Sequence, residues 1–197
     1  MGRKKHYNRD ELIKKATAIF REHGFAGTSS QMLVDGLGVN RFSLYAEFEN
    51  KQALFDAALE YYNNTAVERN FGPLETPTAK IKEIRILLEF FASASKGPSS
   101  GRGCLLCNTA VEFGPTDPNG SEFVQRYFKR ISKAFYKALS NSRNKGLLRD
   151  TVTLKKEADF FTATTLGLFV MIRAKAPKKV IENAAKMAIA HLEGLCA

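Results

Sequence analysis

The sequence lacks any run of 18 apolar residues, which is close to the shortest span that can cross a bilayer as a helix. The longest candidate, residues 158–172, is too short and contains Asp159 and three threonines. No apolar segment follows the basic start of the chain, so we expect no secretory signal. Three cysteines cannot all pair with one another, which favours a reducing compartment. We therefore expect a cytoplasmic protein without a membrane span.

Enzyme signatures are also missing from the sequence. We find no glycine-rich loop of the kind that holds phosphates and no Ser/His/Asp arrangement for nucleophilic catalysis. His6, His23 and His191 fall in unrelated segments, so they cannot join the cysteines in a local four-ligand zinc site. The sequence therefore predicts no enzyme activity, no metal and no cofactor.

Charge is the first feature that the sequence does have. Thirty Lys and Arg against 20 Asp and Glu give a net charge of +10, which favours polyanionic partners. Residues 1–62 carry nine basic and eight acidic side chains, whereas residues 63–197 carry 21 and 12. Residues 129–156 hold nine of these cations, and we interpret them as a solvated face that could attract an acidic ligand. Charge alone supports a protein that coats nucleic acids or membrane surfaces without specificity, and this remains the alternative hypothesis.

The hydrophobic pattern is helical almost throughout, and no alternating strand pattern is present. Nine helices are expected, beginning near residues 9, 29, 41, 51, 77, 104, 121, 153 and 177. Gly24 is expected to end the first helix in a left-handed conformation. The fourth helix is expected to end near Arg69, before the break at residues 71–73, and loops are expected at 97–103 and 115–120. The fold class is therefore all-α.

The three short N-terminal helices form the most informative pattern. The turn Gly38-Val39-Asn40 joins the second helix to the third, and Asn40 is placed to cap the third helix. This arrangement is typical of a helix-turn-helix, whose third helix can enter the major groove of DNA. We expect a DNA-binding domain over residues 1–70, with its reading motif at about 29–48. A helical bundle for effector binding and dimerisation should follow over 76–197.

The residues within this pattern are more specific than the pattern itself. Residues 28–51 resemble the DNA-binding region of TetR-family transcriptional regulators. The resemblance depends on Phe20, Gly24, Thr28, Gly38, Val39, Leu44, Tyr45, Phe48 and Lys51. It implies a homodimeric repressor that binds a near-palindromic operator on double-stranded DNA and whose C-terminal domain binds a small effector.

The resemblance also implies roles for individual side chains. Phosphate contacts fall to Thr28, Ser29, Tyr45 and Lys51, base contacts fall to Gln31, Arg41 and Phe42, and Ser43 completes the DNA-binding set. A lysine is unfavourable at a helix start, so a phosphate partner would explain Lys51. Arg41 can reach guanine O6 and N7, although it could instead be a solvated surface residue, and Tyr45 could be a half-buried spacer. Glu47 and Glu49 flank this surface and oppose phosphate binding.

Two cysteines mark a second candidate site at Gly103-Cys104-Leu105-Leu106-Cys107-Asn108. A cysteine in the first turn of a helix has a lowered pKa, and Lys96 and Arg102 are close in sequence. The segment resembles the sensor motif of a TetR branch that includes electrophile and oxidant sensors, which implies that Cys104 is reactive and that Cys107 could resolve it. The alternative is that both cysteines are structural.

The C-terminal helices supply candidates for an effector pocket and a dimer interface. The candidate pocket residues are Phe91, Phe128, Phe135, Phe161, Thr165 and Phe169, each of which could instead be ordinary core. The resemblance implies a four-helix dimer interface, for which the candidates are Leu168, Ile172, Ala184, Met187 and His191. The predicted function is a sequence-specific transcriptional regulator, a repressor released by a small effector or by thiol modification.

Overall fold

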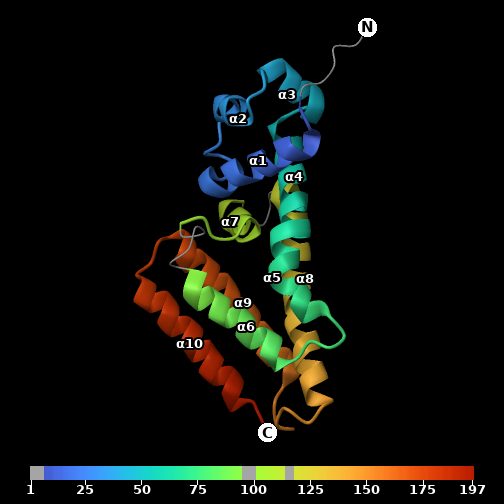
Figure 1. Ribbon diagram of the computed structural model, residues 1–197, viewed down its shortest axis with the longest axis vertical. Helices are drawn as coiled ribbons and strands as arrows, with labels where there is room; N and C mark the ends of the chain where they lie inside the picture. Colours follow the sequence, from blue (N-terminus) through green and yellow to red (C-terminus); the bar gives the residue numbers. More distant parts are fainter. Residues whose placement is uncertain (1–6, 95–100, 114–117) are drawn as a thin grey trace.

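The computed structural model describes residues 7–94, 101–113 and 118–197. Its α-helices and one π-helical segment are α1 (Arg9–His23), α2 (Ser30–Leu37), α3 (Arg41–Phe48), α4 (Lys51–Tyr62), η1 (Asn63–Val67), α5 (Glu68–Glu75), α6 (Ile81–Ala94), α7 (Leu105–Glu112), α8 (Pro118–Arg143), α9 (Leu154–Arg173) and α10 (Lys178–Gly194). The described β-structure is limited to one isolated bridge between Leu148 and Cys196. The all-α prediction is confirmed (Figure 1).

The reading head, which we define as α1 to α3, follows short-range rules of helix capping. Asn8 accepts a hydrogen bond from the Asp10 N–H at 2.8 Å, and Ser29 accepts one from the Met32 N–H at 3.1 Å. Gly38 ends α2 in the left-handed conformation, with φ 69° and ψ 31°. Gly24 ends α1 differently from the prediction, because its φ of 75° is combined with a ψ of 178°.

The helix that leaves the reading head is longer than predicted. α4, η1 and α5 form one continuous helix from residue 51 to residue 75, and the predicted break at residues 71–73 is wrong. Phe71 and Leu74 are buried on this helix, and Pro73 lies within its last turn, where its missing N–H costs a single backbone hydrogen bond. The next helix begins at Ile81 rather than at residue 77. With α4 to α5 counted once, the described residues form nine helices.

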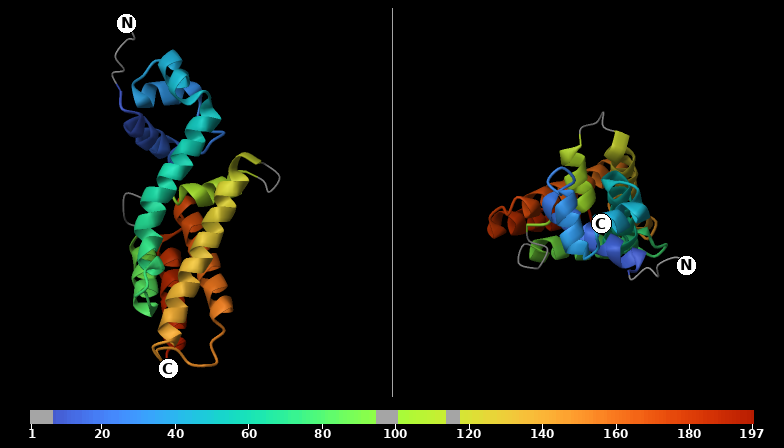
Figure 2. Two further views of the ribbon diagram at one scale, coloured as in Figure 1. Left: turned by 90° about the vertical axis from the view of Figure 1, so that its right-hand side faces the viewer. Right: turned by 90° about the horizontal axis from the view of Figure 1, so that it is seen from above.

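The C-terminal bundle is built around pairs of packed helices. α6 packs against α10, α8 packs against α9, and α5 packs against α8, while α7 crosses between the reading head and the bundle. The helix from α4 to α5 runs from the reading head along the bundle (Figure 2) and passes through residue 70 without a break. The domain boundary near residue 70 stays a prediction. None of the described helices combines the length and apolar content that a bilayer span requires.

Two predicted loops fall partly outside the described residues. Positions 97–100 and 115–117 lie there, as do the cations at positions 3–5 and 96. α8 begins at Pro118, three residues earlier than predicted. The described end of the first loop contains Gly101 and Gly103, both with positive φ.

Candidate DNA-binding interface and effector domain

The recognition helix α3 presents its first residues to solvent. Asn40 accepts a hydrogen bond from the Ser43 N–H at 2.8 Å, which fixes the start of the helix, while Leu44 packs in the core. Arg41 is exposed, and the Phe42 side chain is 85% exposed. The α3 surface thus offers a guanidinium and a phenyl ring side by side, the first able to donate to a base edge and the second able to contact a thymine methyl group. The surface of α3 is therefore suited to contact with DNA bases.

The remaining side chains predicted to contact DNA lie on or next to α2 and α3, and they differ in exposure and in hydrogen-bond partners. Ser29 is exposed and caps α2, and the exposed Gln31 amide donates to Asp35 Oδ1 at 2.8 Å. The Tyr45 hydroxyl is half-buried and lies 2.7 Å from Ser30 Oγ. Ser43 is half-buried at the start of α3. These side chains share a surface, and their roles on DNA remain predictions.

Thr28 and Lys51 are better explained by contacts within the protein. Thr28 is 0% exposed and its hydroxyl donates to the Gly24 carbonyl at 2.6 Å, so the predicted phosphate contact of its side chain is wrong. Lys51 Nζ donates to the Phe25 and Thr28 carbonyls at 3.0 and 3.1 Å and lies 4.2 Å from the centre of the Phe25 ring. Its position at a helix start therefore does not require a phosphate.

The start of α1 is attached to α3 by contacts that the sequence did not indicate. The Tyr7 hydroxyl lies 3.3 Å from the Ser43 carbonyl and 3.4 Å from Glu47 Oε2. Arg9 Nε lies 3.5 Å from Glu47 Oε1. The negative charge of Glu47, which we expect to oppose phosphate binding, is thus partly balanced by the Arg9 cation and the Tyr7 hydroxyl beside it.

A strained turn separates α3 from α4. Glu49 has φ 62° and ψ −57°, and the Asn50 N–H donates to the Phe48 carbonyl at 2.6 Å. These values describe a γ-turn with positive φ, which is rare and unfavourable for residues other than glycine. The turn reverses the chain between the recognition helix and the helix that leads to the bundle.

Cys104 lies in an environment that opposes the predicted reactivity. It is the N-cap residue of α7, but it is 1% exposed, and its Sγ lies 3.1 Å from the Tyr127 hydroxyl. Burial raises the pKa of the Cys104 thiol, against the smaller opposing effect of the Tyr127 hydrogen bond. The expectation of a lowered pKa is therefore wrong for this conformation. Burial likewise raises the pKa of Cys107 to about 12.

The predicted effector residues mostly lie in the core of the bundle. Phe91, Phe135, Phe161, Phe169 and Thr165 are buried, whereas Phe128 is half-buried. Tyr127, one residue earlier, points into the core and was missed, because helical periodicity alone does not fix which of two neighbouring aromatic residues faces inward.

Space for a ligand is small among these residues. A cavity of about 30 Å³ touches Phe91 and Phe169, together with Arg21 and Tyr62, and it has room for about one or two water molecules. Thr165 Oγ1 is buried and has no hydrogen-bond partner among the described residues. An organic effector would therefore require the bundle to open.

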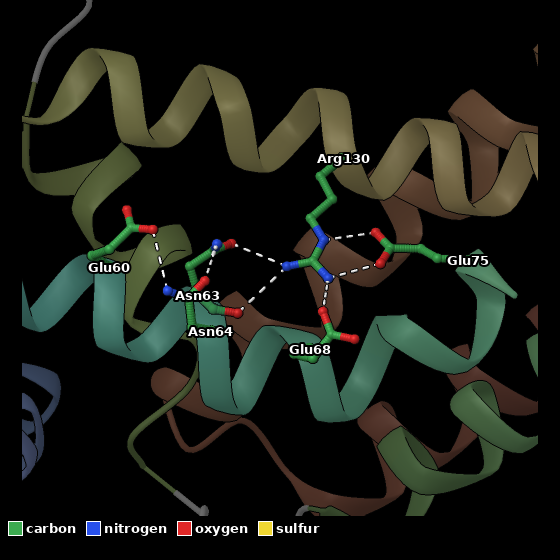
Figure 3. Close-up of polar contacts among 6 residues, drawn as sticks. All are labelled: Glu60, Asn63, Asn64, Glu68, Glu75 and Arg130. Carbon is green, nitrogen blue, oxygen red and sulfur yellow. Dashed lines mark hydrogen bonds and ion pairs between the residues drawn. The ribbon is translucent and has the colours of Figure 1, made fainter.

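Arg130 joins α8 to the helix that leaves the reading head (Figure 3). Its Nε and Nη2 donate to the two carboxylate oxygens of Glu75 at 2.6 and 2.7 Å, and Nη2 also pairs with Glu68. Its Nη1 lies 3.4 Å from the Asn63 carbonyl and 3.3 Å from Asn63 Oδ1, at the start of the π-helical segment η1. Arg130 belongs to the predicted solvated face of residues 129–156, but its side chain is only 21% exposed and holds α8 against η1 and α5, so the prediction is wrong for this residue.

The predicted dimer residues divide into two groups. Leu168 and Ile172 are buried within the protomer, so their assignment to an interface is wrong. α9 is apolar on most of its circumference, and the pattern therefore could not show which side faces outward. Met187 is 69% exposed, Ala184 is half-buried, and the exposed His191 lies 2.6 Å from Glu157. These three remain candidates.

Comparison with known proteins shows where this architecture occurs. Residues 12–58 match the family model described as bacterial regulatory proteins of the tetR family, and residues 81–188 match the tetracyclin repressor-like C-terminal domain. The chain belongs to the TetR family. It is therefore a helix-turn-helix transcriptional regulator and not an enzyme, as predicted.

Individual relatives agree with this assignment along most of the chain. The HTH-type transcriptional regulator YezE of Bacillus subtilis is 28% identical over 198 residues, which cover 98% of this chain and 100% of the relative. The HTH-type transcriptional repressor DhaR of Mycobacterium sp. strain GP1 is 25% identical over 89% of this chain and 87% of its own. A cysteine-substituted TetR-family regulator, CifR, in complex with 26-bp operator DNA, superposes with a TM-score of 0.84. It is 21% identical over 96% of this chain and 98% of its own, which supports the fold.

Proposed function

We propose that this TetR-family protein is a cytoplasmic repressor that binds a near-palindromic operator as a homodimer and leaves it when a small effector binds to the C-terminal bundle. The observation that carries the proposal is the exposed start of α3, where Arg41 and Phe42 face solvent on a firmly capped helix. The relatives support it, because DhaR is described as a repressor and CifR as bound to operator DNA.

The proposed DNA contacts follow the surface of α2 and α3. Arg41 would donate two hydrogen bonds to guanine O6 and N7, and Phe42 would contact a thymine methyl group. Gln31 is exposed at the first turn of α2 and would reach a neighbouring base. Ser29 and Tyr45 would contact phosphates, which position the helix without specifying the sequence.

The proposed dimer interface lies on the outward sides of α9 and α10. Phe160 and Val170 on α9 are 41% and 44% exposed, and Val180 and Met187 on α10 are 48% and 69% exposed. Large apolar side chains exposed on two neighbouring helices are typical of a surface that another chain covers. His191, which lies 4.6 Å from Phe160 between ring centres, would join this surface.

Reversible ligand binding explains release better than thiol modification does. Cys104 is buried and its raised pKa leaves little thiolate at neutral pH. A ligand that opens the cavity lined by Phe91 and Phe169 would change the packing of α6 against α9. Such a ligand can shift the protein only if it prefers that opened state.

Selection from a random DNA pool tests the proposal directly. The purified protein should select a near-palindrome whose half-site centres are about 34–36 Å apart, or a multiple of this distance. Sedimentation at micromolar concentration should show a dimer. Selection of an asymmetric single site, or a monomer in solution, would contradict the proposal. Uniform binding to all sequences would instead support the coating protein suggested by the charge of +10.

A further inference from the structure

Helix α7 lies directly beneath α1, between the reading head and the bundle (Figure 1). It contacts α1 and α4 as well as α8 and α9. Two polar contacts that involve backbone atoms, one at each end of α7, attach it to the reading head. A longer ion pair of 3.9 Å between Arg102 and Glu22 lies beside one of them.

The first contact is a carboxylate held by two consecutive backbone N–H groups. Glu112, the last residue of α7, accepts hydrogen bonds from the Phe25 N–H at 2.9 Å and from the Ala26 N–H at 2.6 Å. Successive N–H groups that converge in this way form a concave anion site. Phe25 and Ala26 belong to the turn between α1 and α2. Glu112 therefore attaches α7 to the middle of the reading head.

Gly24 is the residue that makes this geometry accessible. Its φ of 75° and ψ of 178° fall in a region that is essentially restricted to glycine. A Cβ atom at this position would lie 2.8 Å from Glu112 Oε2, which is closer than real Cβ contacts. The turn is thus shaped to receive the carboxylate from α7.

The second contact lies at the opposite end of α7. Arg21, in the last turn of α1, donates from Nε and Nη2 to the Gly103 carbonyl at 2.8 and 2.6 Å. Gly103 immediately precedes Cys104, the N-cap residue of α7. Arg173 of α9 donates to the Gly101 carbonyl at 3.0 Å, so the bundle holds the same loop.

Aromatic rings close the junction between these two contacts. Phe113 follows Glu112 directly, and its ring centre lies 5.5 Å from that of Phe25 and 5.9 Å from that of Phe55 on α4. The rings resist separation of the two parts but allow sliding, because dispersion contacts are not directional. The directional constraint therefore falls on the polar contacts.

We propose that Glu112 is a positioning residue that sets the half-site spacing accepted by this regulator. The proposal rests on operator binding as a dimer, in which each reading head must meet its half-site at a fixed distance and rotation. One inserted base pair moves a half-site by roughly 3.4 Å and rotates it by about one tenth of a turn. A reading head attached at both ends of α7 cannot follow this movement. A head without the Glu112 contact keeps the Arg21 attachment at the other end of α7 and can turn about it.

The spacing preference distinguishes this role from a contribution to stability. The Glu112 residue is exposed at the surface of the junction, so its replacement removes no core packing. Loss of fold stability would lower binding to all operators alike. Loss of positioning would instead flatten the dependence of affinity on spacing, which no uniform change in affinity can do.

The test uses the operator selected by the full-length parent protein and a series with one or two base pairs inserted or deleted between the half-sites. Fluorescence anisotropy gives the affinity for each. The parent should lose about tenfold or more per inserted base pair, the loss expected when one specific base contact fails. Glu112→Ala should discriminate less than about threefold between neighbouring spacings. Glu112→Asp, whose side chain is shorter by one methylene group, should discriminate between spacings less than the parent and more than Glu112→Ala.

Glu122→Ala is the matched control, because Glu122 is 79% exposed on α8 and its ion pair with Arg126 is 3.9 Å long. It should retain the parent's discrimination. A folded Glu112→Ala variant with the parent's spacing preference would overturn the inference, while specific DNA binding by the parent would leave the proposed function standing. If Glu112→Ala does not fold, Glu112→Gln decides the question in the same way, since it keeps one acceptor oxygen for two N–H donors. A parent that selects no specific DNA would instead contradict the proposed function itself.

Discussion

Replacement of Arg130 by methionine removes the cation that holds α8 against η1 and α5, while an unbranched apolar side chain of similar length remains. The guanidinium donates two hydrogen bonds to Glu75, pairs with Glu68 and contacts Asn63 (Figure 3). The variant leaves two carboxylates close together without their shared cation. We therefore expect a loss of stability in the helix that connects the reading head to the bundle.

The exposure of the three side chains sets the magnitude. Breaking a buried ion pair costs about 3–5 kcal/mol, and breaking an exposed one costs roughly 0–1 kcal/mol. Arg130 is 21% exposed, Glu75 is 32% exposed and Glu68 is 57% exposed, so the network lies between these limits. We expect a loss of about 2 kcal/mol in the free energy of unfolding. For a chain of this length, that corresponds to a decrease in Tm of roughly 4–8 °C.

Thermal and urea unfolding, followed by circular dichroism at one protein concentration, measure this loss, because the stability of a dimer depends on concentration. Arg126→Met is the matched control on the same helix. Arg126 is 57% exposed, and its pairs with Glu60 and Glu122 are 3.6 and 3.9 Å long, so its loss should cost under about 0.5 kcal/mol. A cost below about 0.5 kcal/mol for Arg130→Met, or equal costs for both variants, would refute the reasoning.

Three further predictions concern the reading head and the thiols. Arg41→Ala should cost roughly 1–3 kcal/mol of operator binding and relax the preference at one base pair per half-site, and an unchanged preference in a repeated selection would show that Arg41 does not read a base. Glu49→Gly should raise the free energy of unfolding by about 1 kcal/mol, because it relieves the positive φ of the γ-turn, and urea unfolding that shows no gain would argue against strain there. In timed alkylation of the native protein at pH 7, Cys196 should react before Cys104 and Cys107, since a pKa of about 12 leaves Cys107 a thiolate fraction of only ~10⁻⁵. First labelling of Cys104 by peptide mapping would restore the thiol-sensor hypothesis.

The parts of the fold that the sequence predicted depend on interactions between neighbours in the chain. Asn8 and Asn40 cap their helices through N–H groups two or three residues away, and Gly38 ends α2 in the left-handed conformation. Such contacts are set by local geometry and by a few residue types, so a pattern of letters identifies them. The reading head was predicted for this reason, and the exposed side of α3 followed from it.

Errors arose where burial by distant residues decides the outcome. The first-turn position of Cys104 favours a low pKa, but the bundle buries the thiol and raises its pKa, and the hydrogen bond with Tyr127 opposes this only in part. On α9, Leu168 and Ile172 belong to an apolar surface that extends around most of the helix, so their periodicity could not separate core from interface. In the same way, Phe71 and Leu74 keep α5 helical through Pro73, because tertiary packing outweighs the local tendency of proline to end a helix.

The contacts that orient the reading head are hidden from the sequence for a different reason. Arg21 donates to the Gly103 carbonyl, Lys51 donates to the Phe25 carbonyl, and Glu112 accepts from the Phe25 and Ala26 N–H groups. In each pair one partner is a backbone group, which every residue other than proline carries, and no pairing of side-chain types can reveal it. The backbone conformation decides which of these N–H and carbonyl groups are accessible to a side chain. Gly24 and Gly103, both with positive φ, lie in the turns that expose the backbone groups bound by Glu112 and Arg21. The orientation of the reading head therefore depends on turns whose partners become visible only in three dimensions.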